Sequence, residues 1–376
     1  MAQKNYFARL LIWGRKSAQP GRRGMENLKK KVTIKDIARE AGISPAAVSL
    51  ILNNKPCRIS DEKKKLVKEV ARKKNYVVNQ AAKSLATRKS QMLALILPDI
   101  ENTFFSSLAK QIENRCRANG YSLIIASSDD SRENDRKLLR VLESRGVDGI
   151  FLILSMESLE DVKELLNELS LLTMPYVMID RTLPGLGCAR VSFDHEQGGY
   201  LAAEYLIKKG HRKIGCVYRD DKEGSGKNRL VGYMRALKKY GIPVREEYLK
   251  KGDYRMESGY LAAKALLSTD STATFVCNDM MTLGFLRRLY EEGYKIPEDY
   301  SIVSYDDSLK NYLLGVELTT VVQDIRMLAE EACCLLFKRL CGEEDLMQSL
   351  ILTPSLTVRG SVCERHDGAG MIGGKV

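Results

Sequence analysis

The sequence predicts an all-α helix-turn-helix headpiece followed by an α/β core of two doubly wound, parallel-sheet lobes. Two short helical patterns, separated by a break at Gly42, occupy residues 33–55. After residue 90, short apolar runs alternate with amphipathic stretches, which is typical of parallel strands connected by helices. The charge balance changes at the same place. The first 90 residues carry 23 lysines and arginines against 6 acidic residues, whereas the rest of the chain carries 37 against 42.

The first two predicted helices lie close together in the sequence. Thr33 can cap the first one, and Asp36 stands where a capping box places its acidic residue. Gly42 can adopt the positive φ that a tight turn requires. Ser44 then caps the second helix, with Pro45 in its first turn, where proline is tolerated. This spacing predicts two helices joined by a glycine turn.

A third helix is expected after Ser60, with Leu66, Val67 and Val70 as its apolar stripe. Three such helices form a helix-turn-helix unit, whose second helix enters the DNA major groove. An ordinary three-helix bundle is the alternative interpretation. The basic third helix and its flanks favour DNA binding.

The core should contain strands in the runs MLALILPD, YSLIIASS, GIFLIL, YVMID, KIGCVY, TATFVCND and YSIVSYDD. About 270 residues of this pattern are enough for two lobes. Ligands of doubly wound folds bind at the carboxyl ends of the strands. The polar residues at these ends are therefore candidates for a binding site: Asp99, Asp180, Asn278, Asp279, Asp306 and Asp307.

Composition argues against several classes of protein. No apolar run approaches the roughly 18 residues of a membrane helix, and 29% of the residues are charged, so we expect a soluble protein with no membrane partner. The nine cysteines include no C-x-x-C pair, which argues against a zinc site. Their odd number and the lack of a secretory signal favour reduced thiols and a cytoplasmic location.

Several motifs follow one another along the chain: VTIKDIAREAGIS, NYVVNQAAKSLA, ENTFF, MIDR, KKGHRKIG, CNDMMTLG, IPEDYSIVSYDDS and LTTVVQD. Together they resemble the lac repressor and purine repressor family of bacterial transcription regulators. The resemblance implies a DNA-binding headpiece, a hinge helix and a core similar to periplasmic sugar-binding proteins, in which the chain crosses three times between the lobes. It also implies a homodimer, or in some members a tetramer.

We expect the following division of the chain. Residues 1–28 form a disordered extension (with Met25 as an alternative start to Met1), 29–78 the headpiece, 79–90 the hinge helix and linker, 91–363 the effector-binding and dimerisation core, and 364–376 a tail. The resemblance places about 91–192 and 323–354 in an N-terminal lobe and about 193–322 and 355–363 in a C-terminal lobe.

The resemblance assigns DNA contacts to the second helix, its flanks and the hinge: Thr33, Ser44, Pro45, Ala46, Ala47, Ser49, Leu50, Asn53, Tyr76, Asn79, Ala82, Lys83 and Leu85. Leu85 matches the leucine that the family inserts into the minor groove, although a packing role in a linker is the alternative. The chain departs from the family at Pro45, Ala46 and Leu50. None of these three can make the bidentate hydrogen bonds that identify guanine or adenine.

The matching effector-site positions are Phe104, Phe105, Asp180, Arg229, Tyr254, Asn278, Asp306 and Gln323. Carboxylates and a guanidinium can hydrogen-bond to adjacent hydroxyls while aromatic faces stack on a sugar ring. A sugar or a sugar derivative is therefore the expected effector, with a purine as the runner-up. Arg229 is the only cation in this set, which favours a neutral ligand. The sequence leaves open whether the effector releases or promotes DNA binding.

Two rival functions remain weaker. As an enzyme, the chain offers GAGMIG near its end, but no strand precedes this motif, and GSGK at 224–227 lacks the first glycine of a P-loop. His195, beside Asp194, is interpreted as a structural pair at a lobe crossover. We expect no catalytic residue, metal or cofactor. An extracytoplasmic sugar receptor conflicts with the helix-turn-helix pattern and the missing signal peptide.

Overall fold

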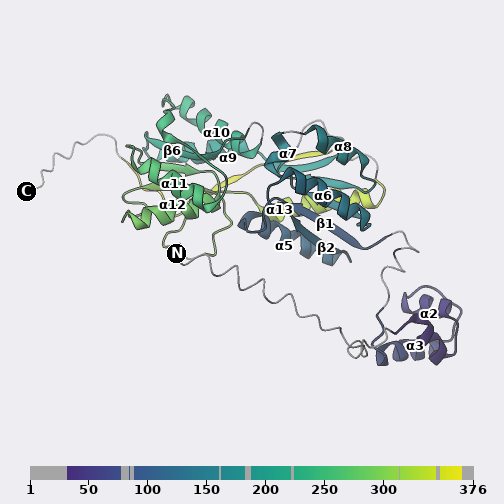
Figure 1. The fold of residues 1–376 in the computed structure, drawn as a ribbon. Helices are drawn as coiled ribbons and strands as arrows, with labels where there is room; N and C mark the ends of the chain where they lie inside the picture. Colours follow the sequence, from purple (N-terminus) through teal and green to yellow (C-terminus); the bar gives the residue numbers. More distant parts are fainter. Residues whose placement is uncertain are drawn as a thin grey trace, which may run out of the picture. The chain divides into compact units, whose positions relative to one another are not determined.

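The computed structural model describes residues 32–77, 84, 89–160, 162–182, 188–221, 224–312, 314–343 and 348–365. The chain separates into two compact units, Met1–Lys83 and Ser84–Val376, and each is described by itself (Figure 1). The predicted residues 1–28, the hinge positions Asn79, Ala82, Lys83 and Leu85, and the tail from 366 onwards lie outside the described residues.

Within its described residues, 32–77, the first unit has three helices around a small apolar core: α1 (Ile34–Ala41), α2 (Pro45–Leu52) and α3 (Asp61–Lys73). The Thr33 amide and hydroxyl both donate to Asp36 Oδ2, at 2.9 and 2.7 Å. Gly42 ends α1 at φ 64°, so the predicted turn is present. Leu66 is an exception to the predicted stripe. It is 39% exposed, and Ala71 takes its place on the buried face of α3 beside Val67 and Val70.

The second unit contains two six-stranded sheets, one in each lobe. The sheet of the N-terminal lobe is parallel throughout and has the order β11-β5-β4-β3-β1-β2. Its strands are β1 (Met92–Leu97), β2 (Ser122–Ser127), β3 (Gly149–Leu152), β4 (Tyr176–Ile179), β5 (Ala189–Phe193) and β11 (Ser349–Leu352). Its helices are α5 (Thr103–Ala118), α6 (Arg132–Ser144), α7 (Met156–Glu160), α8 (Lys163–Leu171) and α13 (Ile325–Leu340).

Both faces of this sheet are covered, as its continuous apolar strands require. Leu93, Leu95 and Leu97 pack against α5 and α13, while Ala94 and Ile96 point to the opposite face, towards α6 and α8. Figure 1 shows the helices on the two sides of the strands. The alternation of strand residues thus builds two separate apolar layers in one lobe.

The sheet of the C-terminal lobe has the order β12-β10-β9-β8-β6-β7, and only β12 runs antiparallel to its neighbour. Its strands are β6 (Ile214–Arg219), β7 (Leu249–Gly252), β8 (Ala273–Val276), β9 (Ser301–Asp306), β10 (Thr319–Val322) and β12 (Ser355–Thr357). Its helices are α9 (His195–Lys208), α10 (Ser225–Lys239), α11 (Met256–Leu267) and α12 (Asp279–Glu291). Helices α9 and α10 lie on one side of the sheet, and α11 and α12 lie on the other (Figure 1).

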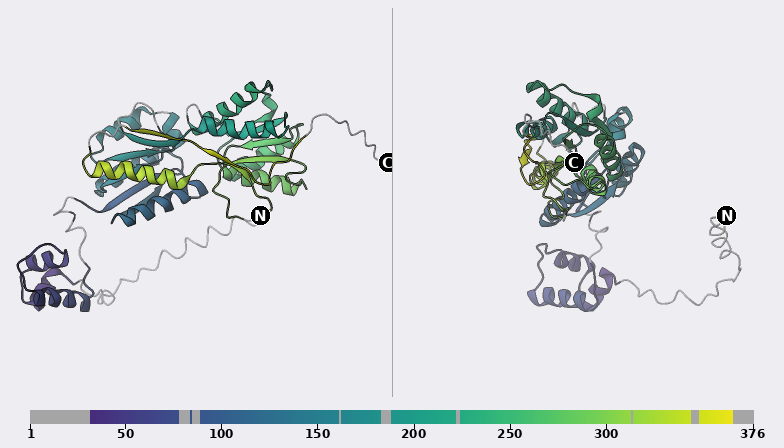
Figure 2. Two further views of the ribbon diagram at one scale, coloured as in Figure 1. Left: turned by 180° about the vertical axis from the view of Figure 1, so that it is seen from behind. Right: turned by 90° about the vertical axis from the view of Figure 1, so that its left-hand side faces the viewer.

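The chain crosses between the lobes three times, from β5 to α9, from β10 to α13 and from β11 to β12. The view from behind shows the last strands running from one lobe to the other (Figure 2). The headpiece and the two parallel-sheet lobes confirm the predicted fold class. Strands β5, β7, β10, β11 and β12 were not among the runs predicted as strands.

Candidate functional site

The exposed face of α2 carries small and apolar side chains. Pro45 and Ala46 are exposed, and Leu50 is 36% exposed. Val48 and Ile51 are buried on the opposite face. The hydroxyl of Ser44 accepts from the Ala47 amide at 3.2 Å and caps the helix. The helix is thus anchored by its inner face, and its outer face is free to meet another molecule.

Two polar side chains on α2 and its C-cap interact with each other. Asn53 Nδ2 donates to the backbone oxygen of Ser49 at 2.8 Å and lies 3.4 Å from the Ser49 hydroxyl. Tyr76, another predicted DNA contact, is half-buried and packs against the headpiece core. Its aromatic ring therefore also has a structural role.

In the second unit, a cavity between the lobes collects most of the predicted effector residues. Its lining residues are Asn102, Phe104, Phe105, Asp180, Arg181, Ser225, Arg229, Tyr254, Asn278 and Asp306. The space between these side chains is about 20 Å³, roughly enough for one water molecule. A larger pocket of about 540 Å³ shares Asp180, Arg181 and Ser225 with it and is also lined by His195. Asp180 follows β4, Asn278 follows β8 and Asp306 ends β9, so the carboxyl ends of strands from both lobes meet here. This is the location that the strand pattern predicted.

The backbone around the cavity is unusual at three of these residues. Asp180, Tyr254 and Asp306 have φ values of 60°, 69° and 104°. Positive φ is uncommon outside glycine and costs free energy that the surrounding structure must supply. Such residues concentrate in binding sites, because the backbone is held where it aims a side chain.

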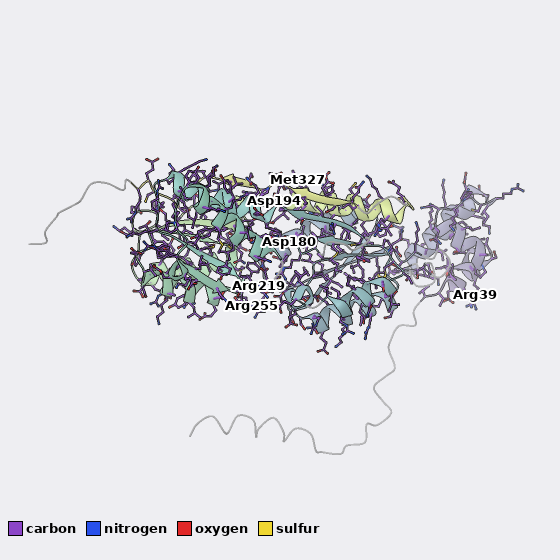
Figure 3. All side chains as sticks on the ribbon, turned by 90° about the horizontal axis from the view of Figure 1, so that it is seen from above. Arg39, Asp180, Asp194, Arg219, Arg255 and Met327 are labelled. Carbon is purple, nitrogen blue, oxygen red and sulfur yellow. The ribbon has the colours of Figure 1, made fainter. Side chains whose placement is uncertain are left out.

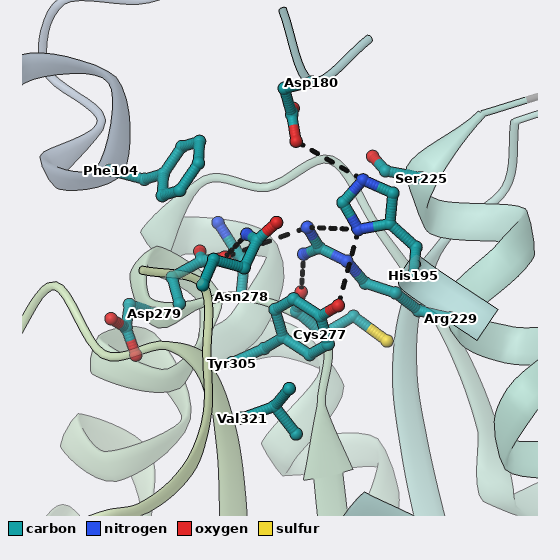
Figure 4. A network of polar contacts seen from close by, with 12 residues as sticks. Phe104, Asp180, His195, Ser225, Arg229, Cys277, Asn278, Asp279, Tyr305 and Val321 are labelled. Carbon is teal, nitrogen blue, oxygen red and sulfur yellow. Dashed lines mark hydrogen bonds and ion pairs between the residues drawn. The ribbon is translucent and has the colours of Figure 1, made fainter. Parts of the chain in front are cut away.

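Arg229 is the central side chain of the cavity (Figure 4). It is buried, its Nη1 donates to the backbone oxygen of Cys277, and its guanidinium lies 3.7 Å from the ring centre of Tyr305. Its Nη2 is 3.8 Å from Asp306 Oδ1. Among the described residues, Arg229 Nε has no hydrogen-bond partner. A buried guanidinium with an unused donor is suited to bind a polar ligand.

Close packing of α9 on α10 places Arg229 beside His195. A Cβ atom at Gly199 of α9 would lie 2.0 Å from the backbone oxygen of Arg229. Only glycine permits this approach of the two helices. The approach brings Arg229 Nη2 to 3.4 Å from His195 Nδ1.

His195 connects the two lobes. Its Nε2 lies 3.3 Å from Asp180 Oδ1, and its Nδ1 lies 3.4 Å from the Tyr305 hydroxyl (Figure 4). The arginine can only donate, so Nδ1 is the acceptor and the ring proton is on Nε2, facing Asp180. Burial holds the pKa of His195 below its usual value, which keeps the ring neutral. The pairing of His195 with Asp194 was wrong, because Asp194 Oδ1 caps α9 by accepting from the Gln197 amide at 2.8 Å.

Asp306 has an unusual protonation state. Burial raises its pKa to about 8, against the opposing effect of Arg229. At neutral pH the carboxyl group is therefore mostly protonated and can donate as well as accept. Gln323 Nε2 donates to Asp306 Oδ1 at 2.7 Å. Gln323 does not line the cavity, so the structure places it behind Asp306 as a supporting residue.

The remaining strand-end candidates have other surroundings. Asp99 Oδ1 accepts from the Glu101 amide, Asp279 binds Ser304 and Ser308, and Asp307 pairs with Arg359 at 2.7 Å. None of the three lines the cavity between the lobes.

The sequence did not point to Asn102, Arg181, Ser225 or Tyr305, and it gave His195 only a structural role. Arg181 is the last residue of the MIDR motif, so the motif itself was an available signal. It corrects the expectation that Arg229 is the only cation of the site, because Arg181 lines the cavity and is 4% exposed. Its guanidinium lies 5.3 Å from the ring centre of Phe105.

Polar contacts hold the lobes together beside the cavity. Asp130, on the loop after β2, binds Arg181 Nη1 of its own lobe at 2.6 Å and Arg219 Nη1 of the other lobe at 3.0 Å. The Thr103 and Ser308 hydroxyls also meet across the boundary, at 2.6 Å. Asp180 and Arg219 are labelled between the lobes in Figure 3. These contacts join the two lobes on this side of the cavity.

The GSGK segment has no free phosphate site. The Asp221 carboxylate accepts from the amide of Gly226 at 3.1 Å and from the amide of Lys227, at the N-terminus of α10. A phosphate would need the same amides. In the part of the chain that the structure describes, no helix is long and apolar enough to cross a membrane, and no three metal-ligating side chains form a cluster.

Comparison with known proteins gives this arrangement a family. Residues 33–79 match the model for bacterial regulatory proteins of the lacI family, and residues 203–362 match a periplasmic binding protein-like domain. The chain is 33% identical to the HTH-type transcriptional regulator DegA of Bacillus subtilis over 332 residues, which cover 88% of this chain and 98% of DegA. The chain belongs to the lacI family. It is a DNA-binding transcriptional regulator with an effector-binding core.

Solved structures of lacI-family regulators agree with the fold. The lac repressor dimer bound to operator and the anti-inducer ONPF has a TM-score of 0.79 and 25% identity, over 89% of this chain and all of the repressor chain. The regulator CelR in complex with cellobiose has a TM-score of 0.65 and 28% identity, over 88% of this chain and 99% of CelR. These similar proteins are transcription regulators rather than enzymes.

Proposed function

We propose that this lacI-family protein is a repressor that binds operator DNA as a homodimer. Its operator affinity changes when a small sugar or sugar derivative binds between the core lobes. The observation that carries this proposal is the cavity around Arg229. A guanidinium, two carboxyl groups and the Asn278 amide surround a space with aromatic walls.

The chemistry of the cavity matches a ring of hydroxyls. A forked guanidinium donates to adjacent oxygens, and a carboxylate such as Asp180 accepts from hydroxyls. The rings of Phe104 and Tyr254 offer faces for the apolar side of a sugar. CelR, which is similar over nearly its whole length, binds cellobiose, and this supports a sugar here. Arg181 adds a second cation, so sugar acids and sugar phosphates belong among the derivatives to be tested.

The size of the space bears on how a ligand enters. The space of about 20 Å³ around Arg229 is too small for a sugar, but it shares Asp180, Arg181 and Ser225 with a neighbouring pocket of about 540 Å³. A sugar that reaches Arg229 therefore either extends from this larger pocket or shifts the lobes or their side chains. The effector can change DNA affinity only by its difference in affinity for two arrangements of the core. Either sign is compatible with this cavity.

Calorimetry on the purified full-length protein tests the proposal. Neutral sugars, sugar acids and sugar phosphates form one panel, and hypoxanthine and guanine form a second. We expect a member of the first panel to bind. Asp306→Ala should weaken that binding about tenfold or more, because unpaired buried polar groups cost about 1–3 kcal/mol. A gel shift with and without the ligand then gives the sign of the response.

A purine is the second candidate, because Phe104, Phe105 and Tyr254 could stack on a base. If a purine binds and no sugar does, the sugar proposal is overturned, but the role of the protein as a transcription regulator is not affected. Sedimentation of the free protein tests the dimer, and a single species of monomer mass would contradict it.

A further inference from the structure

The recognition helix α2 carries none of the side chains that usually read bases. Specific recognition of guanine uses arginine or lysine, and recognition of adenine uses asparagine or glutamine, each through paired hydrogen bonds. The residues from Pro45 to Leu52 include no such side chain, and the exposed ones are Pro45, Ala46 and Leu50. Ala46 and Leu50 are four residues apart, so their side chains lie on the same side of the helix.

The polar groups next to this face are engaged within the helix. Asn53, the C-cap, is the nearest side chain that could form paired hydrogen bonds with adenine. Its Nδ2 donates to the Ser49 backbone oxygen at 2.8 Å. The Ser49 hydroxyl lies within 3.4 Å of the same nitrogen. Both side chains contact α2 instead of projecting away from it.

Cations near α2 indicate that this face meets a polyanion. Lys55, three residues after the end of α2, and Lys63 on α3 are both exposed. Lys63 Nζ also donates to the backbone oxygen of Ala41 at 3.3 Å, beside the turn that leads into α2. Such cations bind phosphates and position the helix without reading sequence. The bases under α2 are therefore left to apolar side chains.

The major groove presents one apolar group, the C5 methyl group of thymine. We infer that Leu50 and Ala46 contact thymine methyl groups, so that each operator half-site has A·T pairs beneath α2 and Leu50 is the main residue that sets specificity. This inference rests on the proposed binding of an operator. It states which bases that operator contains.

The test begins with selection of binding sites from random duplex DNA by the full-length protein. Each thymine of the selected half-site is then replaced in turn by deoxyuridine, which lacks only the methyl group. We expect one or two positions at which the replacement weakens binding about fourfold, which corresponds to about 0.8 kcal/mol for one buried methyl group. Replacement at the other thymines should change affinity less than twofold.

A matched pair of variants assigns the effect to α2. Leu50→Ala should remove most of the preference for thymine over deoxyuridine. Leu66→Ala should keep the preference, because Leu66 is similarly exposed, at 39%, but lies on α3. Circular dichroism and a melting curve confirm that both variants are folded.

The outcomes separate the inference from the proposed function. A selected half-site without thymine, or equal affinity for thymine and deoxyuridine at every position, overturns the methyl readout and leaves operator binding standing. If the selected site is rich in A·T pairs but the protein binds its thymine and deoxyuridine forms with equal affinity, the protein reads DNA shape instead. If selection enriches no site at all, operator binding itself fails.

Discussion

Asp180 and His195 belong to different lobes, and their side chains lie 3.3 Å apart, Oδ1 to Nε2, across the boundary between the lobes. Both are buried. Burial would raise the pKa of Asp180, but His195 and Arg229 hold it below its usual value, so the carboxylate stays charged. This contact therefore links the closing of the lobes to the position of Arg229.

We predict that His195→Ala lowers the free energy of unfolding by about 1–3 kcal/mol and weakens the effector response. The change removes the contact across the lobes at 3.3 Å from the Asp180 carboxylate, and it removes the acceptor that Arg229 Nη2 meets at 3.4 Å. Urea denaturation measures the first effect and gel shifts with effector measure the second.

His211→Ala is the control for this prediction. His211 is also buried, but it contacts Thr272 and the backbone oxygen of Cys363, away from the cleft. The His211→Ala variant should be less stable than the parent protein but should keep the parent's response to effector. If both variants respond to effector as the parent does, His195 has only a structural role.

The raised pKa of Asp306 makes the stability of the core depend on pH. At pH values between the ordinary carboxyl pKa and about 8, Asp306 of the folded protein keeps a proton that the same residue has released in the unfolded chain. The free energy of unfolding should therefore fall as pH rises, by at most about 1.4 kcal/mol per pH unit. Below about pH 6.5, His195 opposes this trend, because its lowered pKa means that the unfolded chain binds the extra proton.

The clearest interval for this effect is therefore pH 6.5–8, and urea midpoints across it provide the measurement. Asp306→Asn should flatten the slope there, because asparagine does not titrate. Asp99→Asn, which changes a carboxyl outside the cavity, should not. An identical slope in parent and Asp306→Asn would show that Asp306 does not titrate in this range.

The contact between Asp130 and Arg219 gives a prediction about the shape of the core. Arg219→Ala removes an ion pair between the lobes, so the free protein should populate a more open arrangement. Small-angle X-ray scattering would then show a larger radius of gyration without effector. Lys251→Ala removes an exposed ion pair with Asp220 within one lobe, and should leave the radius unchanged. If Arg219→Ala has the same radius of gyration as the parent protein, other contacts keep the lobes together.

Much of the fold could be predicted because its signals are local. The glycine turn at Gly42 and the capping at Ser44 depend on neighbouring residues. The central strands β1, β3 and β8 are apolar runs because they are covered on both faces. Strands β5 and β11 were missed because they lie at one edge of the sheet, where polar residues such as Arg190 and Ser349 interrupt the apolar pattern.

The site was predicted less completely for a different physical reason. Asp306 and Asn278 could be found because they end or follow recognisable strands. His195 was given the wrong partner because Asp194 is adjacent in sequence, whereas Asp180 belongs to the other lobe. Tyr305 resembles an ordinary strand residue, and its role under Arg229 depends on how α10 packs. Contacts between residues that are far apart in the chain produce no pattern in the local sequence, so they could not be predicted from it.

The charge of the headpiece predicts how operator binding responds to salt. Each phosphate that a lysine or arginine neutralises releases counterions, and the logarithm of the affinity then falls with the logarithm of salt concentration by about 0.9 per neutralised phosphate. With 23 basic residues among the first 90, several phosphates per subunit should be neutralised, and affinity should fall by orders of magnitude between low and physiological salt. Lys55→Ala removes one exposed cation just after α2, so it should lower the slope by about one in each subunit without changing which sequence is preferred. Lys264→Ala, on α11 of the core, is the matched control and should leave the slope as it is. Titrations of one operator at four salt concentrations give both slopes, and a nearly flat dependence for the parent would rule out phosphate binding as the main source of its affinity.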